Sequence, residues 1–235
     1  METAPVRKHF KEELEDLRER VIYMGGLVET AIHRSLESVL QRDPELAEAV
    51  TGELEPEINR LQVEVDERAL RLMALQQPLA MDLRFIAAVL KIGNDLERMA
   101  DLAVNIAQGA SHLIELPLAS LRVDLPLMAE RAGKMLRAAL DAFMTRDAEL
   151  ARTVLVADEE VDNLRDLIYR QLIRSMVADS REVERSLALM FVARNLERIA
   201  DHATNIAEDV IFWVEGVDVR HHFAETKPPA APNPA

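Results

Sequence analysis

Apolar side chains recur along most of the chain at steps of three, four or seven residues, the spacing of one helix face. The first run comprises Leu14, Leu17, Val21, Met24, Val28, Ile32 and Val39. Asp43 and Pro44 then offer an N-cap followed by a proline at the first helical position. We expect a second helix from there, through Ile58, Leu61, Val65 and Leu72, to Gln77-Pro78. A third is expected from about Leu79 to Leu116, ahead of Pro117.

The same pattern begins again after a short link at residues 118–125. Arg42-Asp43-Pro44-Glu45-Leu46-Ala47 is echoed by Arg146-Asp147-Ala148-Glu149-Leu150-Ala151, and Glu57-Ile58-Asn59 by Glu160-Val161-Asp162. Aligning residues 94–107 with 194–207 gives nine identities in fourteen positions: Leu96/Leu196, Glu97/Glu197, Arg98/Arg198, Ala100/Ala200, Asp101/Asp201, Ala103/Ala203, Asn105/Asn205, Ile106/Ile206 and Ala107/Ala207. Helical periodicity alone would preserve the apolar positions but not the charges between them. The chain is therefore predicted to be an internal duplication of a three-helix unit.

The expected fold is all-α, with six long helices in two tandem antiparallel three-helix bundles. The first bundle would span residues 1–117 and the second residues 118–222. Asp179 and Glu182 predict a capping box at the start of the sixth helix. Residues 223–235 lack a pattern that could bury a core, so we expect a disordered tail there.

Composition narrows the possible functions. Hydrophobic residues make up 49% of the chain, aromatic residues 4%, and there are only 7 glycines, a mixture that favours helices over sheets. The net charge of -14 argues against nucleic acid as a partner. The absence of cysteine excludes disulfides, thiolate metal sites and cysteine catalysis. No apolar run approaches the roughly 20 residues that span a bilayer, and the charged start lacks a signal core, so a cytoplasmic protein is expected.

The repeated motif divides into a packing face and an acidic row. Each residue of an α-helix turns by about 100°. If Leu196 is taken as zero, the apolar residues of the motif fall within about 80° of it, whereas Glu197, Asp201 and Asn205 fall at about 100°, 140° and 180°. The first copy gives the same angles for Glu97, Asp101 and Asn105. Each half is thus expected to present two carboxylates and an amide in a row on the outer side of its bundle.

The second helix of each half supplies a row that could face the first. Asp158 and Asp162 are four residues apart, and Glu55 and Asn59 hold the corresponding places in the first half. Two such rows would bring four oxygen-bearing side chains together, which suits hard or borderline cations such as Mg²⁺, Mn²⁺ or Fe. The alternative is a solvated surface, because acidic pairs at this spacing are common on outer helix faces. The duplication and the second row favour metal sites made of Glu55, Asn59, Glu97 and Asp101 in the first half and Asp158, Asp162, Glu197 and Asp201 in the second.

Other polar residues carry weaker signals. Arg98 and Arg198 are expected to form salt bridges with acidic neighbours. His202 is expected to be a surface histidine, since Leu102 is its counterpart in the first half. The pair His221-His222 lies beyond the last helix, where a ligand role is less expected than a simple chain end. Arg84 could pair with Asp82 or serve a partner.

Two backbone features also raise expectations. Gly25 and Gly26 interrupt a helix at a cost of about 1 kcal/mol each relative to alanine, for which a close helix contact is a better explanation than a hinge. Pro56 removes a helix hydrogen bond next to Glu55, so we expect a kink there. Such a kink could either aim Glu55 at a metal ion or misplace it.

Several segments, in order along nearly the whole chain, resemble the PhoU family of bacterial phosphate-signalling regulators. They are Met24-Gly25-Gly26-Leu27-Val28-Glu29, Gln77-Pro78 with Asp82-Leu83-Arg84, both copies of the acidic motif, and residues 212–221. The resemblance implies two tandem three-helix bundles, a homodimer and a cytoplasmic location. It also implies a negative regulator that restrains the Pst phosphate ABC transporter and keeps the PhoR sensor kinase from activating the phosphate-starvation response.

The resemblance further implies metal ions, Fe, Mn, Mg or Zn, bound in multinuclear clusters at the acidic motifs. Two departures from the family pattern bear on this. Asn59 stands where many members have Asp, which removes a charge from the first site. Ala100 and Ala200 replace the usual Gly and should alter packing without removing the carboxylates.

The leading hypothesis is therefore a non-enzymatic, metal-binding adaptor. A helical adaptor without metal is the first alternative. A di-iron redox or storage protein is the second, and it is disfavoured because the sequence contains no Glu-x-x-His pair of the kind that such bundles use.

Overall fold

The protein is described by a computed structural model that covers residues 4–76, 78–115 and 123–220. Within these ranges it forms helices α1 (Ala4–Gln41), α2 (Pro44–Ala49), α3 (Glu55–Gln76), α4 (Ala80–Glu115), α5 (Leu125–Thr145), α6 (Ala148–Ala178) and α7 (Val183–Glu215). A π-helical turn, η1 (Val50–Leu54), joins α2 to α3, and a 3₁₀ turn, η2 (Ser180–Glu182), precedes α7. Since α2, η1 and α3 follow one another without a break, each half has three long helices, and the all-α prediction is confirmed. None of these helices has the length and apolarity needed to cross a membrane.

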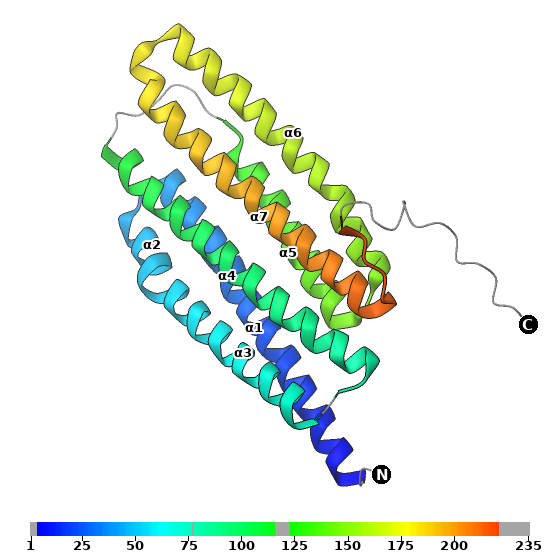
Figure 1. The fold of residues 1–235 in the computed structure, drawn as a ribbon. Coiled ribbons are helices and arrows are strands. Elements are labelled where there is room, and N and C mark those ends of the chain that lie inside the picture. The colour runs from blue at the N-terminus through cyan, green and yellow to red at the C-terminus, as the bar shows by residue number, and fades with distance from the viewer. Residues whose placement is uncertain (1–3, 77, 116–122, 221–235) are drawn as a thin grey trace, which may run out of the picture.

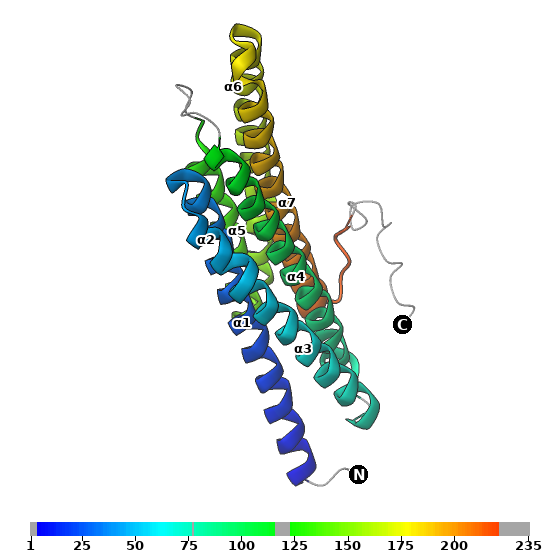
Figure 2. The same ribbon diagram turned by 90° about the vertical axis from the view of Figure 1, so that its left-hand side faces the viewer.

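The two halves lie side by side along their length (Figure 1). Helices α4 and α7 pack against each other at the centre, and α1 of the first half also contacts α5 of the second. Figure 1 shows α3 and α6 on opposite outer sides of this arrangement, and α3 lies on the side that faces the viewer in Figure 2. The buried apolar residues of both halves form one continuous core, so each half covers a face of the other.

The duplication extends to the turn between the first two long helices of each half. Arg42 and Arg146 both adopt a left-handed conformation, with φ of 59° and 58°, which is uncommon for residues other than glycine. Asp43 and Asp147 follow as N-caps, and each side chain accepts a hydrogen bond from a backbone N–H of the first helical turn. The sequence echo around these residues thus encodes the same turn twice.

The start of α7 differs from expectation. Asp179 Oδ1 accepts a hydrogen bond from the backbone N–H of Arg181, and the Asp179 N–H donates to the carbonyl of Ser175. Its N–H is therefore already engaged, and the reciprocal bond of a capping box with Glu182 does not form. The predicted capping box was wrong, because residues 180–182 make a 3₁₀ turn and α7 begins at Val183.

Gly25 makes a close helix contact, and the backbone near Pro56 is irregular. A Cβ on Gly25 would lie 2.5 Å from Leu140 Cδ1 of α5, whereas a Cβ on Gly26 would meet nothing within 4 Å. The expectation of a close helix contact is confirmed for Gly25, and α1 runs through both positions without a break. Near Pro56 the helix is irregular, since the π-helical turn η1 ends at Leu54, two residues before the proline.

Three aromatic rings join the halves at one end of the molecule. Phe85 of α4 stacks on Phe143 of α5 at 5.9 Å between ring centroids, and Trp213 of α7 lies 5.0 Å from Phe85 and 5.5 Å from Phe143. All three are buried. Since each such pair adds about 0.5–1.5 kcal/mol beyond its buried area, this cluster helps fix one half on the other.

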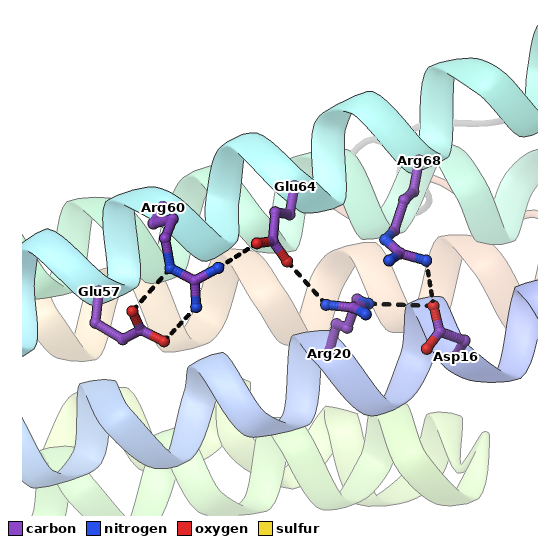
Figure 3. A network of polar contacts seen from close by, with 6 residues as sticks. All are labelled: Asp16, Arg20, Glu57, Arg60, Glu64 and Arg68. Carbon is purple, nitrogen blue, oxygen red and sulfur yellow. Dashed lines mark hydrogen bonds and ion pairs between the residues drawn. The ribbon is translucent and has the colours of Figure 1, made fainter.

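A ladder of ion pairs covers the outer side of α1 and α3, as Figure 3 shows. Arg20 of α1 contacts Asp16 at 3.1 Å and Glu64 of α3 at 2.8 Å, and Arg68 of α3 reaches Asp16 at 2.7 Å. Arg60 extends the ladder by pairing with both Glu64 and Glu57. Exposed pairs contribute little singly, so the ladder serves mainly to set the register of these two helices.

Candidate functional site

The acidic face of the second half lies between α6 and α7. The pKa of Asp158 is raised to about 6, first by burial and then by the negative charges of Asp201, Asp162 and Glu197. The pKa of Asp201 is also raised, first by burial and then by Glu197 and Asp162. Four predicted site residues from two helices are therefore close enough for the charge of each to affect the pKa of another.

Arg165 of α6 lies among these carboxylates. Its Nη1 donates to Glu197 of α7 and stands 3.1 Å from Asp162 Oδ1, while its Nη2 is 2.9 Å from Asp166. Only 25% of the Arg165 side chain is exposed. A guanidinium thus occupies part of the position expected for a metal ion. Sequence reasoning missed Arg165, although its place three residues after Asp162 was a signal that it could turn toward the same face.

The acidic face of the first half lies between α3 and α4 and is built differently. Asn59 Nδ2 donates to Glu55 Oε1 at 2.5 Å, so these two predicted residues bind each other. Burial raises the pKa of Glu97, with further contributions from Asp101 and, across the helix pair, from Glu55. Asn59 Oδ1 is buried and accepts no hydrogen bond from the described residues.

The two faces differ in the basic residues that accompany their carboxylates. Arg98 lies 3.5 Å from both Glu97 Oε2 and Asp101 Oδ2, so the expected salt bridges form, although they are long and exposed. Gln62, three residues after Asn59 as Arg165 is after Asp162, binds Asp66 at 3.1 Å. The second face has one carboxylate more than the first, but it also holds a partly buried guanidinium. The first face thus lacks both the negative charge of Asp162, replaced by Asn59, and the positive charge of Arg165, replaced by Gln62.

The third member of the motif row in the second half, Asn205, is exposed and also contacts α4. Asn205 Nδ2 donates to Asp95 Oδ1 of α4 at 3.2 Å, and His202 Nδ1 lies 2.7 Å from the same oxygen. Asn205 is exposed as expected, but the prediction of a surface His202 was wrong, because α4 packs on α7 there and only 17% of the His202 side chain is exposed. Farther along the same interface Lys91 of α4 binds Asp209 of α7 at 2.7 Å.

As placed, the carboxylates are not assembled around a common point. Among the described residues no three His, Asp or Glu side chains gather closely enough to hold a metal ion. Arg165 engages Glu197 and Asp162 in the second face, and Asn59 engages Glu55 in the first. A metal ion would have to displace Arg165 from one face and turn Asn59 in the other. The orphaned Asn59 Oδ1 and the raised pKa values of Asp158 and Glu97 mark where a cation would relieve an unfavourable arrangement.

The remaining candidates are settled or lie elsewhere. Arg84 Nε donates to the carbonyl of Trp213 at 3.2 Å, near the C-terminal end of α7. A cation is favourable there because the last carbonyls of a helix lack intrahelical partners. His221-His222, the expected tail at 223–235 and the expected boundary between 117 and 118 lie outside the described residues.

The fold and its two faces define a class: an internally duplicated helical bundle with a carboxylate-bearing face in each half. Comparisons with known proteins agree. The family model for the PhoU domain matches residues 21–110 and again residues 125–210. The chain belongs to the PhoU family.

Relatives cover nearly the whole chain. A phosphate-specific transport system accessory protein PhoU homolog of Zymomonas mobilis is 42% identical over 89% of this chain and 88% of its own length. The homolog of Pseudomonas aeruginosa is 39% identical over 93% and 90%, and the Escherichia coli protein of that name is 34% identical over 94% and 93%. The crystal structure of PhoU from Pseudomonas aeruginosa superposes with a TM-score of 0.84, at 38% identity, over 88% of this chain and 100% of that one. The phosphate transport system regulatory protein PhoU of Streptococcus pneumoniae gives 0.81 at 27% identity, over 89% and 99%.

Proposed function

We propose that this protein is a cytoplasmic negative regulator of phosphate uptake and of the phosphate-starvation response. It would act as an adaptor between the ATPase of a Pst phosphate ABC transporter and a PhoR-type histidine kinase, and not as an enzyme. The match of both halves to the PhoU domain carries this proposal. Relatives named as accessory proteins of phosphate-specific transport support it, at 34–42% identity over most of the chain.

We further propose that the acidic faces bind divalent or trivalent metal ions, Fe, Mn, Mg or Zn, in sites that can hold more than one ion. The donor set of carboxylates and one amide is of the kind that hard cations prefer. Two observations support the proposal. A cation would accept the lone pair of the unpartnered Asn59 Oδ1, and it would attract the carboxylates that repel one another around Asp158. Bound metal would also cross-link α3 to α4 and α6 to α7, which would stiffen the faces offered to partners.

An exposed apolar surface is available for protein contacts. It runs over the end of α6 and the beginning of α7 and consists of Leu167, Ile173, Val177, Val183, Leu187 and Phe191, each 37–84% exposed. Large exposed apolar side chains on neighbouring helices are a feature of protein contact surfaces. This surface supports both the proposed homodimer and the binding of a partner protein.

Co-purification with a Pst-type ATPase and with a PhoR-type kinase, at high and low phosphate, tests the regulatory proposal. We expect binding to both, and binding to the kinase that depends on phosphate level. Variants with Glu97→Gln and Asp101→Asn, or with Glu197→Gln and Asp201→Asn, should lose metal and weaken partner binding. Glu159→Gln, on the exposed side of α6, is the control. Absence of binding to either partner at both phosphate levels would overturn the proposal.

The second candidate function is a helical adaptor that needs no metal. The placement of Arg165 between Glu197 and Asp162 favours it, since the guanidinium already neutralises these carboxylates. Elemental analysis of protein purified without a histidine tag separates the two. Protein free of metal that also fails to bind Mg²⁺, Mn²⁺ or Fe would support the metal-free adaptor. A carboxylate redox or storage protein would instead require oxidation of bound iron by oxygen.

A further inference from the structure

A cavity of about 280 Å³ opens where the two halves meet at one end of the molecule. The early part of α1, the start of α4, the end of α5 and the end of α7 all contribute to its wall. The polar residues that line it include three cationic side chains, Lys11, Arg18 and Arg146, and two acidic ones, Glu15 and Asp82. It lies away from both acidic faces, and it is a local excess of positive charge in a chain whose net charge is -14.

Arg18 is the deeply placed cation of this cavity. Only 9% of its side chain is exposed, and its guanidinium stacks on Phe85 at 5.3 Å and on Trp213 at 5.7 Å. Nη1 donates to Glu15 at 2.7 Å, but the buried Nε donates to no acceptor among the described residues. A buried donor without a partner costs about 1–3 kcal/mol, and more on a charged group. The fold therefore holds a buried guanidinium that its own carboxylates do not saturate.

Arg146 supplies a second guanidinium from the solvent side. It stands at the left-handed C-cap of α5 and stacks on Trp213 at 5.5 Å. Among the described residues, no carboxylate oxygen lies within 4.0 Å of its guanidinium. The pKa of Arg18 is lowered chiefly by burial, and the charge of Arg146 lowers it further, so the two cations are close enough to repel each other. An anion bound between the two guanidiniums would attract both and so offset their mutual repulsion.

We propose that this pocket binds a small oxyanion of the phosphate type, either free phosphate or the phosphoryl group of a small ester. Guanidinium groups present paired N–H donors that match two oxygens of such an anion. Since Glu15 already neutralises Arg18 in part, Lys11 and Arg146 outweigh Asp82 at the mouth of the cavity. The net negative charge of the chain disfavours anion binding in general, so specific capture requires a site with converging cations. The proposal goes beyond the regulatory role and depends on neither the metal ions nor the partner proteins.

The only tryptophan of the chain, Trp213, provides a direct probe, since both guanidiniums stack on it. The intact protein is titrated with inorganic phosphate at constant ionic strength while its fluorescence is followed. Sodium chloride serves as the control for ionic strength. Sulfate tests whether any tetrahedral dianion binds, and glycerol phosphate tests whether an ester binds more tightly than free phosphate. A saturable change in fluorescence with phosphate or its ester, absent with chloride, supports the proposal. The ligand that binds more tightly shows whether the site takes free phosphate or a phosphate ester.

Two variants localise the effect. Arg146→Asn should raise the dissociation constant tenfold or more, and Arg18→Gln should abolish binding. Arg42→Asn is the matched control, because Arg42 holds the same left-handed position in the other half and the change in charge is identical. Thermal unfolding with and without phosphate gives a second readout that does not depend on fluorescence. The proposal is overturned if no oxyanion gives a saturable change beyond chloride, or if Arg146→Asn binds phosphate as tightly as the unaltered protein.

Discussion

Asp95 Oδ1 lies 2.7 Å from His202 Nδ1, although the two residues are 107 positions apart in the sequence. The bond crosses from α4 to α7 and so links the two halves directly. Asp95 is 8% exposed, and its oxygen also accepts from Asn205. A buried carboxylate is tolerated when hydrogen bonds satisfy it, and here both donors come from the partner half. The repeated motif is therefore part of the interface between the halves as well as a packing element within each.

Replacing Asp95 with alanine should weaken this interface. Asp95→Ala leaves His202 and Asn205 without their shared acceptor, at an expected cost of about 1–3 kcal/mol in unfolding free energy. Urea denaturation followed by circular dichroism measures it. Asn94→Ala, at the exposed neighbouring position, is the control and should change stability far less. Equal losses for the two variants would show that the hydrogen bonds across the interface contribute nothing.

The raised pKa of Asp158 predicts a pH dependence of stability. Its value of about 6 in the folded state exceeds the roughly 3.9 of an unfolded aspartate. The folded state then binds more protons than the unfolded state between these values, so stability falls as pH rises from about 4 to about 6 and stays lower above. Asp158→Asn should raise the melting temperature at pH 7.5 and have little effect at pH 4. Glu159→Gln should show no such difference between the two pH values, and a pH-independent effect of Asp158→Asn would contradict the prediction.

The glycine pair in α1 offers a matched test of packing. Gly26→Ala should stabilise the protein by up to about 1 kcal/mol, because alanine is the better helix former and its Cβ meets open space. Gly25→Ala gains the same propensity but places a Cβ against Leu140, so the gain should be cancelled or reversed. Melting temperatures of the two variants measure the difference, expected at about 2–4 °C per kcal/mol for a chain of this size. The close contact would be refuted if both substitutions stabilised the protein equally.

Metal affinity of the two acidic faces should rise by different substitutions, an added carboxylate in the first and a removed guanidinium in the second. Asn59→Asp adds a carboxylate to the first face, and Arg165→Gln frees Glu197 and Asp162 in the second from their guanidinium. Each change should tighten Mn²⁺ binding on the order of tenfold, or about 1.4 kcal/mol, as measured by calorimetry. Arg198→Gln, which removes an exposed arginine on α7, controls for net charge. If neither Asn59→Asp nor Arg165→Gln changed the affinity, the faces would not be metal sites.

Local features of the fold were predictable because they depend on nearby residues. Periodic apolar positions such as Val21, Met24 and Val28 are fully buried as expected, and Asp43 and Asp147 cap the helices that their sequence echo indicated. The pairing of the acidic rows across α6 and α7 also followed from spacing. The capping box at Asp179 failed because a hydrogen bond to Ser175 competes for its N–H, and such local competition is invisible in the residue types.

The sequence alone determined that the chain is helical and duplicated, and which residues of the motif build the core. It did so because helical periodicity and self-similarity are properties of the linear order of residues. Only the tertiary structure decided that α4 lies on α7, which half-buries His202 against Asp95 and brings Asn205 within hydrogen-bond distance of the same carboxylate. It also decided that Arg165 enters the acidic face and that Arg18 and Arg146 meet over Trp213. Angles around one helix show what a side chain could face, whereas the neighbour that covers it depends on how distant segments pack.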